Sequence, residues 1–235
     1  MKATFERASP FVPADIVYKE FHLTVYNRTK QIPADAISTF KFETMLISAF
    51  ESVVNTPIDL DAFKSSYDTA TSVDFSGLAP QDQQSFYELL KRFTRANVTV
   101  RDVRTLTSIP ADIFASPLPN LLVIDFEGTS ISTIGDTAFS GLTNLDKLRF
   151  FDAQLSPEEI SKTAFQGLPS KVNVELTAHL ALTYFEEDRF KQVLDNTFSL
   201  NVGYQNPDCT LGDFCYLRNH VCDERALWIC ENRKI

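Results

Sequence analysis

The sequence is poor in glycine, and its cysteines are confined to one end. Seven glycines among 235 residues argue against a barrel or sandwich rich in tight turns. The first 208 residues contain no cysteine, so any disulfide bonds within the chain cross-link only the segment near the C-terminus. One tryptophan and two methionines contrast with 20 phenylalanines, so the architecture repeatedly requires a large, flat apolar side chain.

An excess of basic residues and a long apolar run are also missing. The formal net charge is -9, which opposes binding to nucleic acids and anionic membranes. No run of about 18 or more apolar residues is present, and Met1 to Phe11 has no signal-type apolar core. We therefore expect no nucleic-acid partner, no membrane span and no targeting segment; if the protein is exported, this chain is its processed form or a fragment.

The four cysteines all lie within the last 27 residues. An even number of clustered cysteines favours two disulfide bonds, which form in an oxidising compartment and indicate a secreted or extracellular protein. Two alternatives stay open: four reduced thiols in a cytosolic protein, and a zinc site that uses His220, although the close cysteine pair of structural zinc sites is missing. Glycosylation sequons at Asn27 and Asn97 agree with export but also arise by chance. The cysteines are Cys209, Cys215, Cys222 and Cys230.

A repeat of about 25 residues runs through nearly the whole chain. Each unit has an apolar-x-apolar pair whose two members point to the same side of a strand. Successive pairs begin 22, 28, 25, 26, 24, 26 and 26 residues apart. Stacked in parallel, such strands bury a continuous core that no single unit can bury alone. The pairs are Leu23/Val25, Met45/Ile47, Val73/Phe75, Val98/Val100, Ile124/Phe126, Leu148/Phe150, Val174/Leu176 and Leu200/Val202.

A second apolar anchor follows each of the first seven pairs by 13 to 18 residues. Most of these anchors are phenylalanines, which accounts for a good part of the phenylalanine excess. We expect them to form a column on the side of the solenoid opposite the strands. The anchors are Ile37, Phe63, Phe86, Phe114, Phe139, Phe165 and Phe190.

The two central units resemble the typical extracellular leucine-rich repeat. The resemblance covers roughly residues 16 to 205 and implies an α/β solenoid with about eight short parallel strands on its concave face and an irregular or helical convex side. Gln81 to Thr94 carries apolar residues at helical spacing, so we expect a helix there. The phrases that carry the resemblance are Ile109-Pro110-Ala111-Asp112-Ile113-Phe114 and Ala138-Phe139-Ser140-Gly141-Leu142.

The chain departs from the family pattern at one turn position. Family members usually carry Asn, Cys or Thr five residues after the first strand residue, where the side chain satisfies backbone groups. The asparagine ladder is essentially absent here, so the turn amides must find other partners. The 28-residue spacing also predicts an inserted loop from Asn55 to Tyr67. The aligned positions are Arg28, Phe50, Leu78, Val103, Thr129, Ala153, His179 and Gln205.

A solenoid exposes its core at each end unless a cap covers it. The stretch from Asn206 to Cys230 resembles the cysteine-rich C-terminal flank of extracellular leucine-rich-repeat proteins, with Leu227 and Trp228 as its packing face. The resemblance implies Cys209–Cys222 and Cys215–Cys230 bonds, although the flank usually begins with a closer cysteine pair. The expected division is residues 1–15, an N-terminal cap or leader; residues 16–205, the repeats; and residues 206–235, a disulfide-stabilised C-terminal cap.

No catalytic constellation, metal site or cofactor motif is recognisable. The three histidines are His22, His179 and His220, and only the last two are expected to lie near each other. Nucleophile-elbow, zinc-protease, phosphate-loop and EF-hand spacings are all missing. We expect a protein that is not an enzyme and holds no metal or cofactor.

The outward residues of the strands are the expected binding surface, because repeat proteins of this shape bind through the concave sheet. The group richest in contact chemistry contains arginines and an aromatic side chain, which commonly anchor interfaces. The alternative is that its charges only pair across strands. A glycan on Asn97 would obstruct the middle of this face. The group is Arg101, Asp125, Glu127, Lys147, Arg149 and Phe151.

Together these features predict a secreted protein-binding or scaffolding protein that acts through its concave face. The alternative is a non-catalytic companion subunit of an extracellular enzyme complex. That arrangement is similar to the luciferase complexes of arthropods, whose larger subunit is a similar leucine-rich-repeat protein. In either role the partner is another protein, and the chain is one subunit of a larger assembly in the second.

Overall fold

The computed structural model describes most of the chain from Ile16 to Ala178 and three further strands. Of residues 54–55, 176–178, 197–203, 221–222 and 227–231 it describes the backbone alone. Side chains are described for residues 16–26, 31–34, 36–37, 40–49, 57–80, 82–155, 159–169 and 172–175. The elements are β1 Val17–Val25, β2 Lys41–Ala49, β3 Val54–Asn55, a 3-10 turn Lys64–Ser66, β4 Ser72–Ser76, β5 Leu78–Ala79, α1 Gln83–Arg92, β6 Asn97–Arg101, β7 Ser108–Ile109, β8 Val123–Glu127, β9 Thr133–Ile134, β10 Lys147–Ala153, β11 Val172–Ala178, β12 Thr197–Gly203, β13 Val221–Cys222 and β14 Leu227–Glu231.

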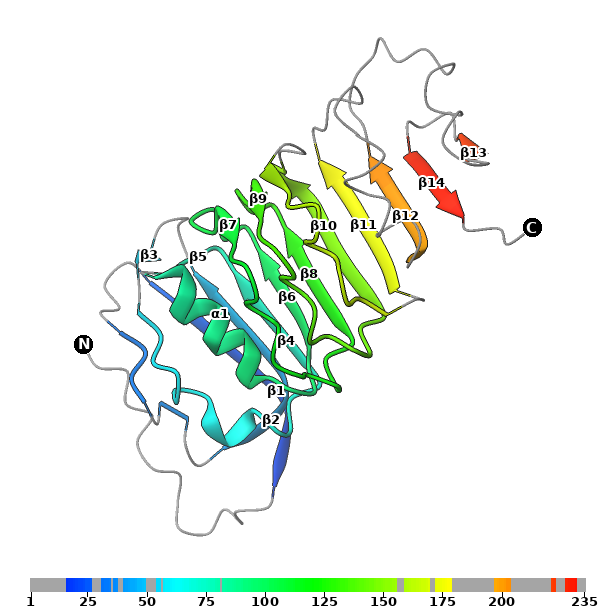
Figure 1. Ribbon diagram of the computed structural model, residues 1–235. Coiled ribbons are helices and arrows are strands. Elements are labelled where there is room, and N and C mark those ends of the chain that lie inside the picture. The colour runs from blue at the N-terminus through cyan, green and yellow to red at the C-terminus, as the bar shows by residue number, and fades with distance from the viewer. Residues whose placement is uncertain are drawn as a thin grey trace.

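Ten of these strands form one sheet in the order β1-β2-β4-β6-β8-β10-β11-β12-β14-β13. From β1 to β12 every neighbouring pair is parallel, whereas β14 runs antiparallel to both β12 and β13. The sheet forms one layer, and α1 with the irregular connecting segments forms the other (Figure 1). The predicted solenoid of parallel strands is confirmed, and its second side, predicted to be irregular or helical, has little helix.

The strand register follows the predicted apolar pairs from β2 onward. Met45 lies opposite Val73, Val73 opposite Val98, and the same step continues to β12. In β1 the predicted pair Leu23/Val25 packs on the core, but its predicted alignment was wrong, because Phe21 and not Leu23 lies opposite Met45. Apolar residues alternate along β1 with a period of two, so two registers place a pair inward. In the observed register the Phe21 ring packs on Phe42 with centroids 4.6 Å apart.

The predicted phenylalanine column is present in the middle of the solenoid. The rings of Phe114 and Phe139 stack at 6.0 Å and 11°, and those of Phe139 and Phe165 at 5.9 Å and 17°. All three side chains are buried, as are the predicted anchors Ile37 and Phe63. Phe190 lies outside the described residues. The column is therefore a continuous apolar seam between consecutive repeats.

The helix α1 lies inside the predicted span and corrects one of the anchors. Its N-cap is Asp82, whose carboxylate accepts hydrogen bonds from the backbone N–H groups of Gln84 and Ser85. Consecutive helical residues point about 100° apart, so the two adjacent aromatic residues of α1 meet different neighbours.

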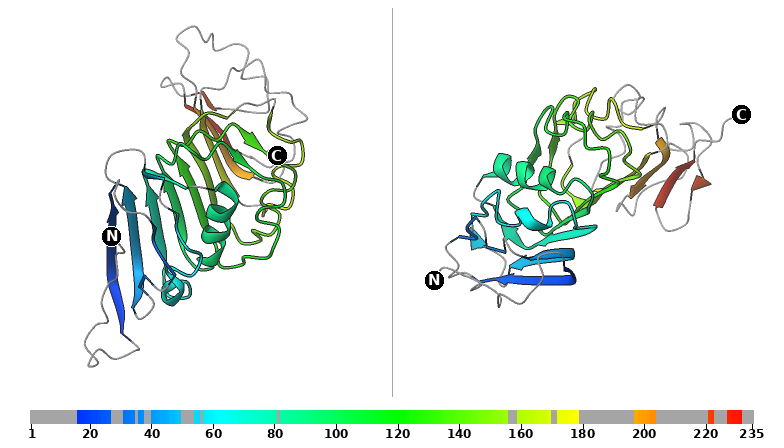
Figure 2. Two further views of the ribbon diagram at one scale, coloured as in Figure 1. Left: turned by 90° about the vertical axis from the view of Figure 1, so that its left-hand side faces the viewer. Right: turned by 90° about the horizontal axis from the view of Figure 1, so that it is seen from below.

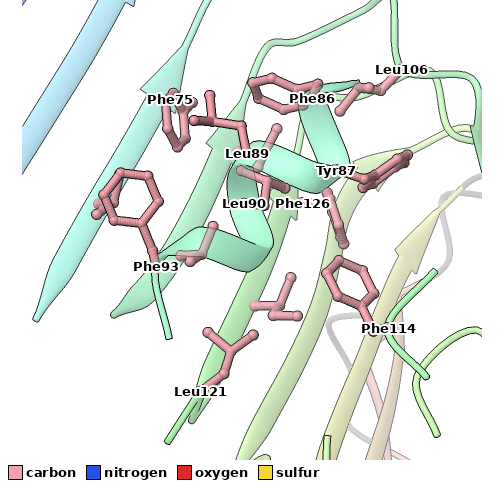
Figure 3. Packing of buried hydrophobic residues seen from close by; sticks show 14 of the residues in the cluster. Phe75, Phe86, Tyr87, Leu89, Leu90, Phe93, Leu106, Phe114, Leu121 and Phe126 are labelled. Atoms are coloured by element: carbon pink, nitrogen blue, oxygen red, sulfur yellow. The ribbon is translucent and has the colours of Figure 1, made fainter. Parts of the chain in front are cut away.

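Phe86 is buried as predicted, but it is not the next ring of the column. Its ring meets the edge of Phe75 at 5.4 Å, whereas Tyr87 meets Phe114 edge-on at 6.0 Å. Figure 3 shows Phe86 turned towards Phe75 and Tyr87 turned towards Phe114. The Tyr87 hydroxyl also donates to the Ser108 carbonyl at 2.8 Å. Tyr87 therefore joins the helical repeat to the one that follows it.

The expected inserted loop is packed against the preceding repeat. The Ser65 hydroxyl donates to the Ile37 carbonyl at 2.8 Å, and the Phe42 N–H donates to the Ser66 hydroxyl at 3.2 Å. Ser66 is fully buried, and Phe63 beside it is one of the core rings. The additional residues of this repeat thus carry hydrogen bonds of their own across the repeat boundary.

The turns that lack asparagine are closed by backbone geometry. At four of these turns the residue just before the aligned position has a positive φ: 64° at Gly77, 53° at Asp102, 61° at Gly128 and 53° at Asp152. Glycine and aspartate tolerate this left-handed conformation better than most residues. The N–H groups of the first three donate across to the next repeat at 2.8 Å, to the carbonyls of Arg101, Glu127 and Phe151. The aligned positions themselves, Leu78, Val103, Thr129 and Ala153, are buried.

Thr129 at one of these positions gives a first testable prediction. Its hydroxyl oxygen is buried and has no hydrogen-bond partner among the described residues. Because a buried polar atom without a partner costs stability, Thr129→Val should leave the free energy of unfolding unchanged or raise it by up to about 1 kcal/mol. Thermal and urea unfolding measure the change. The matched variant Thr129→Ser keeps the hydroxyl but loses a methyl group, so it should cost about 1 kcal/mol. A larger loss for Thr129→Val than for Thr129→Ser would contradict the prediction.

Candidate functional site

The outward face of the sheet, called the strand face below, is built by alternation along each strand. In β4 and β8 the second and fourth residues are buried and the first, third and fifth are partly exposed. Parallel pairing in register then places equivalent residues side by side in rows. One row contains Asp74, Thr99, Asp125, Arg149 and Glu175. The next row contains Ser76, Arg101, Glu127 and Phe151.

Seven charged side chains pair with one another across β4, β6, β8, β10 and β11: six from these two rows, and Lys147 from the preceding row, level with Val123. Four are carboxylates and three are cations, so the cluster has one formal negative charge in excess. We call this cluster the charge network. Its ion pairs join Arg101 to Asp74 at 3.5 Å and to Glu127 at 3.3 Å, Arg149 to Asp125 and to Glu127 at 3.1 Å each, and Lys147 to Glu175 at 3.1 Å.

Glu127 connects the two arginines. Its Oε2 accepts from Arg101 Nε at 3.3 Å and from Arg149 Nη2 at 3.1 Å. The contact between Arg149 Nε and Asp125 Oδ1 is an ion pair at 3.1 Å without the alignment of a hydrogen bond. Because Glu127 is held from two sides, it fixes both guanidinium groups on the strand face.

Burial opposes ionisation of two carboxylates in the charge network. It raises the pKa of Asp125 above its ordinary value, and the nearby Arg149 only partly offsets this effect while Glu127 adds to it. Burial likewise raises the pKa of Asp74, with Arg101 as the opposing charge. A carboxyl group whose pKa is raised by folding favours the folded state in its protonated form. The ionised forms of Asp74 and Asp125 therefore cost stability at neutral pH.

Asp125→Asn tests this electrostatic balance. The stabilising contribution of the Asp125 carboxyl is present below its unfolded pKa and is lost as pH rises through the raised folded pKa. At pH 7 the variant should therefore unfold at the same urea concentration as the original protein or at a higher one, and this advantage should shrink as pH falls towards about 4. Urea unfolding at both pH values measures the difference.

The comparison variant for this experiment is Glu127→Gln. It weakens two hydrogen bonds to arginines and should cost about 1–2 kcal/mol at pH 7. A greater loss for Asp125→Asn than for Glu127→Gln at pH 7 would show that Asp125, and not Glu127, organises the charge network.

Phe151 lies at the end of the charge network and remains 41% exposed. The Arg149 guanidinium carbon lies 4.9 Å from the centroid of its ring, within the range of a cation–π contact. Arg149 is thus held by two carboxylates and an aromatic ring. The ring presents an apolar surface beside charges that are already paired.

A comparison with known families identifies this part of the chain. Residues 96–155 match the family model of the leucine-rich repeat. The match supports a leucine-rich-repeat protein. It spans β6 to β10 and contains all six residues of the predicted binding group. No curated protein and no solved structure matches the chain.

The main sheet brings the predicted binding group together, and the ion pairs on it show which members pair. Arg101, Asp125, Glu127 and Arg149 are linked through shared contacts, whereas Lys147 contacts Glu175. Asp74 and Glu175 complete the charge network but were not part of the predicted group. The sequence signal that could have found them is a negative charge on the strand next to a predicted cation: Asp74 beside Arg101, and Glu175 beside Lys147.

The other predicted residues are less fully placed. Asn97 is exposed at the start of β6, level with Ser72 of β4, so it lies on the strand face as predicted. Asn27, Cys209, Cys215, His179 and His220 lie outside the described residues. Only the backbone of Cys222, Cys230, Leu227 and Trp228 is described, within β13 and β14. The disulfide bonds and glycans therefore stay predictions.

In the part of the chain that the structure describes, no three or more His, Cys, Asp or Glu residues are grouped so that they could hold a metal ion. None of its helices has the length and apolar character needed to cross a membrane.

Proposed function

We propose that this protein binds another protein through its strand face and contributes no catalytic chemistry of its own. Leucine-rich-repeat domains commonly mediate protein interactions, and the matched residues 96–155 carry the charge network. The observation that supports the proposal most directly is the exposed Phe151 ring beside the Arg149 guanidinium, which Asp125 and Glu127 hold in place. Aromatic and arginine side chains are the residue types that most often anchor protein interfaces.

The pairing of the charges supports the same proposal. Five ion pairs link the members of the charge network to one another. A partner that covers Phe151 would meet a polar surface whose charges already have partners, as at the rim of many interfaces. The alternative considered from the sequence, that these charges pair across strands, is thus observed and is compatible with an anchor at Phe151.

We place this binding role outside the cell. The four clustered cysteines and the two sequons support an oxidising compartment. A narrower form of the proposal makes the chain a non-catalytic companion subunit of an extracellular enzyme complex, the alternative that the sequence left open. Intact mass with and without reductant tests the compartment: two disulfide bonds are expected, and four free thiols in freshly isolated extracellular material would contradict this setting.

The binding proposal is tested with a matched pair of variants. The partner is first isolated by cross-linking and mass spectrometry, and its affinity is then measured for the original protein, Phe151→Ala and Leu122→Ala. Leu122 is 46% exposed and lies just before β8, whereas Phe151 is level with the last residue of β8. The two side chains are therefore similarly exposed and lie level with opposite ends of β8.

Phe151→Ala should weaken binding by at least about 10-fold, as expected for an interface anchor, and Leu122→Ala should change it less than about 2-fold. Arg149→Lys keeps the charge but loses the planar group that stacks on Phe151, so it should also weaken binding. Equal affinities for all variants would refute the strand face as the binding surface. A stoichiometric enzyme among the partners would support the companion role, and an enzymatic activity of the isolated chain would refute the non-catalytic part of the proposal.

A further inference from the structure

The sequon at Asn97 lies wholly within the residues whose side chains are described. In Asn97-Val98-Thr99 the strand alternation buries Val98 and turns Asn97 and Thr99 outward onto the strand face. The backbone N–H of Asn97 donates to the Thr71 carbonyl at 2.9 Å. The side-chain amide of Asn97 is exposed and makes no hydrogen bond to the described residues. Its nitrogen therefore faces solvent from a strand that is paired on both sides.

The strand face differs on the two sides of Asn97. Towards β8 and β10 it carries most of the charge network and Phe151. Towards β4 and β2 its outward side chains are mostly hydroxyls, and neither an arginine nor an aromatic anchor is among those level with the rows. Figure 2 shows α1 and the connecting segments on one side of the sheet, so both regions are turned away from them. The outward residues of the second region are Ser72, Asp74 and Ser76 of β4 and Thr44, Leu46 and Ser48 of β2.

Asn97 and Phe151 lie two strands apart and at opposite ends of the rows. Phe151 is level with Glu127, Glu127 is level with Arg101, and Arg101 is the last residue of the strand that Asn97 begins. With about 4.8 Å between strands and about 3.3 Å per residue, their Cα atoms are roughly 16 Å apart. A circular interface of about 800 Å² per partner has a radius of about 16 Å. A glycan on Asn97 therefore lies at the rim of an interface centred on Phe151 and not in its middle.

We propose that Asn97 carries an N-linked glycan that limits the partner to the part of the strand face around Phe151. This inference rests on the proposed function and adds which part of the face the partner can cover. In the modification, Asn97 Nδ2 forms a bond to the anomeric carbon of an oligosaccharide carried on a lipid diphosphate. The bond between that carbon and the diphosphate oxygen breaks, the lipid diphosphate leaves, and Nδ2 loses one proton.

The position of the glycan determines which partners fit. A bulky, solvated group at the start of β6 excludes a partner that covers the whole strand face from β2 to β11. It admits a partner that approaches from the carboxyl ends of β8 and β10, where Phe151 lies. The glycan thus selects for a narrow footprint.

The modification is tested on the full chain secreted from eukaryotic cells. Mass spectrometry of the tryptic peptide of residues 96–101 should show the sugar on Asn97, and peptide N-glycosidase should remove it and leave aspartate. Thr99→Ser keeps the sequon and should keep the glycan, whereas Asn97→Gln should lose it. Circular dichroism checks that the variants fold.

The footprint is tested with the partner isolated as described above. Asn97→Gln should change its affinity by less than about 3-fold, because residues at the rim contribute little to binding. Glu127→Asn creates a sequon with Thr129 in the row of Phe151, and its glycosylated form is separated by lectin chromatography. This form should bind at least about 10-fold more weakly than the matched variant Glu127→Gln, which carries no sugar at that position.

Three results would overturn the inference. The first is an Asn97 that is unmodified in most secreted molecules, and the second is an affinity change of more than about 3-fold for Asn97→Gln in either direction. The third is a glycosylated Glu127→Asn that binds as tightly as Glu127→Gln. An unmodified Asn97 together with binding that depends on Phe151 refutes the glycan alone. A modified Asn97 together with binding that does not depend on Phe151 refutes the proposed function.

Discussion

Phe139→Ala should lower the free energy of unfolding by about 3–5 kcal/mol. The ring is fully buried, stacks on Phe114 and Phe165, and meets Phe150 edge-on at 6.3 Å and 66°. Its truncation leaves a cavity that three consecutive repeats share, and adjusting one loop cannot fill it. Urea denaturation followed by circular dichroism measures the loss.

The matched control is Phe151→Ala, which removes the same ring from an exposed position. It should change the free energy of unfolding by less than about 1 kcal/mol. A loss below about 1 kcal/mol for Phe139→Ala, or equal losses for the two variants, would show that the phenylalanine column does not hold the repeats together.

Gly141→Ala should destabilise the protein by about 2–3 kcal/mol. A Cβ atom at this position would lie 2.3 Å from the Ser116 carbonyl oxygen and 2.5 Å from that of Phe114. Both are backbone atoms of the preceding repeat, so they cannot move aside by a change of rotamer. The Gly141 N–H already donates to the Phe114 carbonyl at 2.7 Å, and the alanine would strain this hydrogen bond.

Gly77→Asp is the control for backbone strain at glycine. Gly77 has a positive φ, but a Cβ atom there would lie 3.4 Å from its nearest neighbour, the Ala49 carbonyl oxygen. Asp102 and Asp152 adopt the same conformation at the equivalent turns. The substitution should therefore cost less than about 1 kcal/mol. If Gly77→Asp proved as damaging as Gly141→Ala, close approach between repeats would not be the reason for glycine at position 141.

The strand positions were predictable because their signal repeats. Seven strands from β2 to β12 carry two apolar residues at equivalent positions of the repeat. A strand that is ambiguous on its own can therefore be aligned from the repeats on either side of it. Among the described strands β1 has a neighbour on one side only, and its alternation extends over Phe21, Leu23 and Val25. Periodicity alone cannot choose between two registers there, and the packing of Phe21 on Phe42 decides.

The convex side was less predictable, because neighbouring aromatic residues give the same signal. Phe86 and Tyr87 both fit the spacing of the column, and only the rotation of α1 determines which ring meets Phe114. The residues that close the turns in place of the asparagine ladder could, however, have been found in the sequence. Gly77, Asp102, Gly128 and Asp152 occupy equivalent places just before the aligned positions, and both residue types favour a positive φ.

The strand face was predictable in position but not in its pairing. Alternation identified Arg101, Asp125, Glu127 and Arg149 as outward residues, and the register confirms it. Which carboxylate each arginine contacts depends on side-chain geometry that the sequence does not encode locally. The inclusion of Asp74 two strands away from Asp125 is the clearest example.

The order of strands along the sheet from β1 to β12 also determines how the molecule opens. Among the described residues, each of these sheet strands pairs with the sheet strands of the preceding and the following repeat, so cooperativity passes from neighbour to neighbour as in a one-dimensional lattice. Fraying therefore starts at an edge strand, which has one neighbour to hold it. The strands that carry the charge network, β4 to β11, have a neighbour on each side and are the last to exchange their amide hydrogens with solvent. Partial opening at either edge thus leaves the Arg149 and Phe151 surface intact.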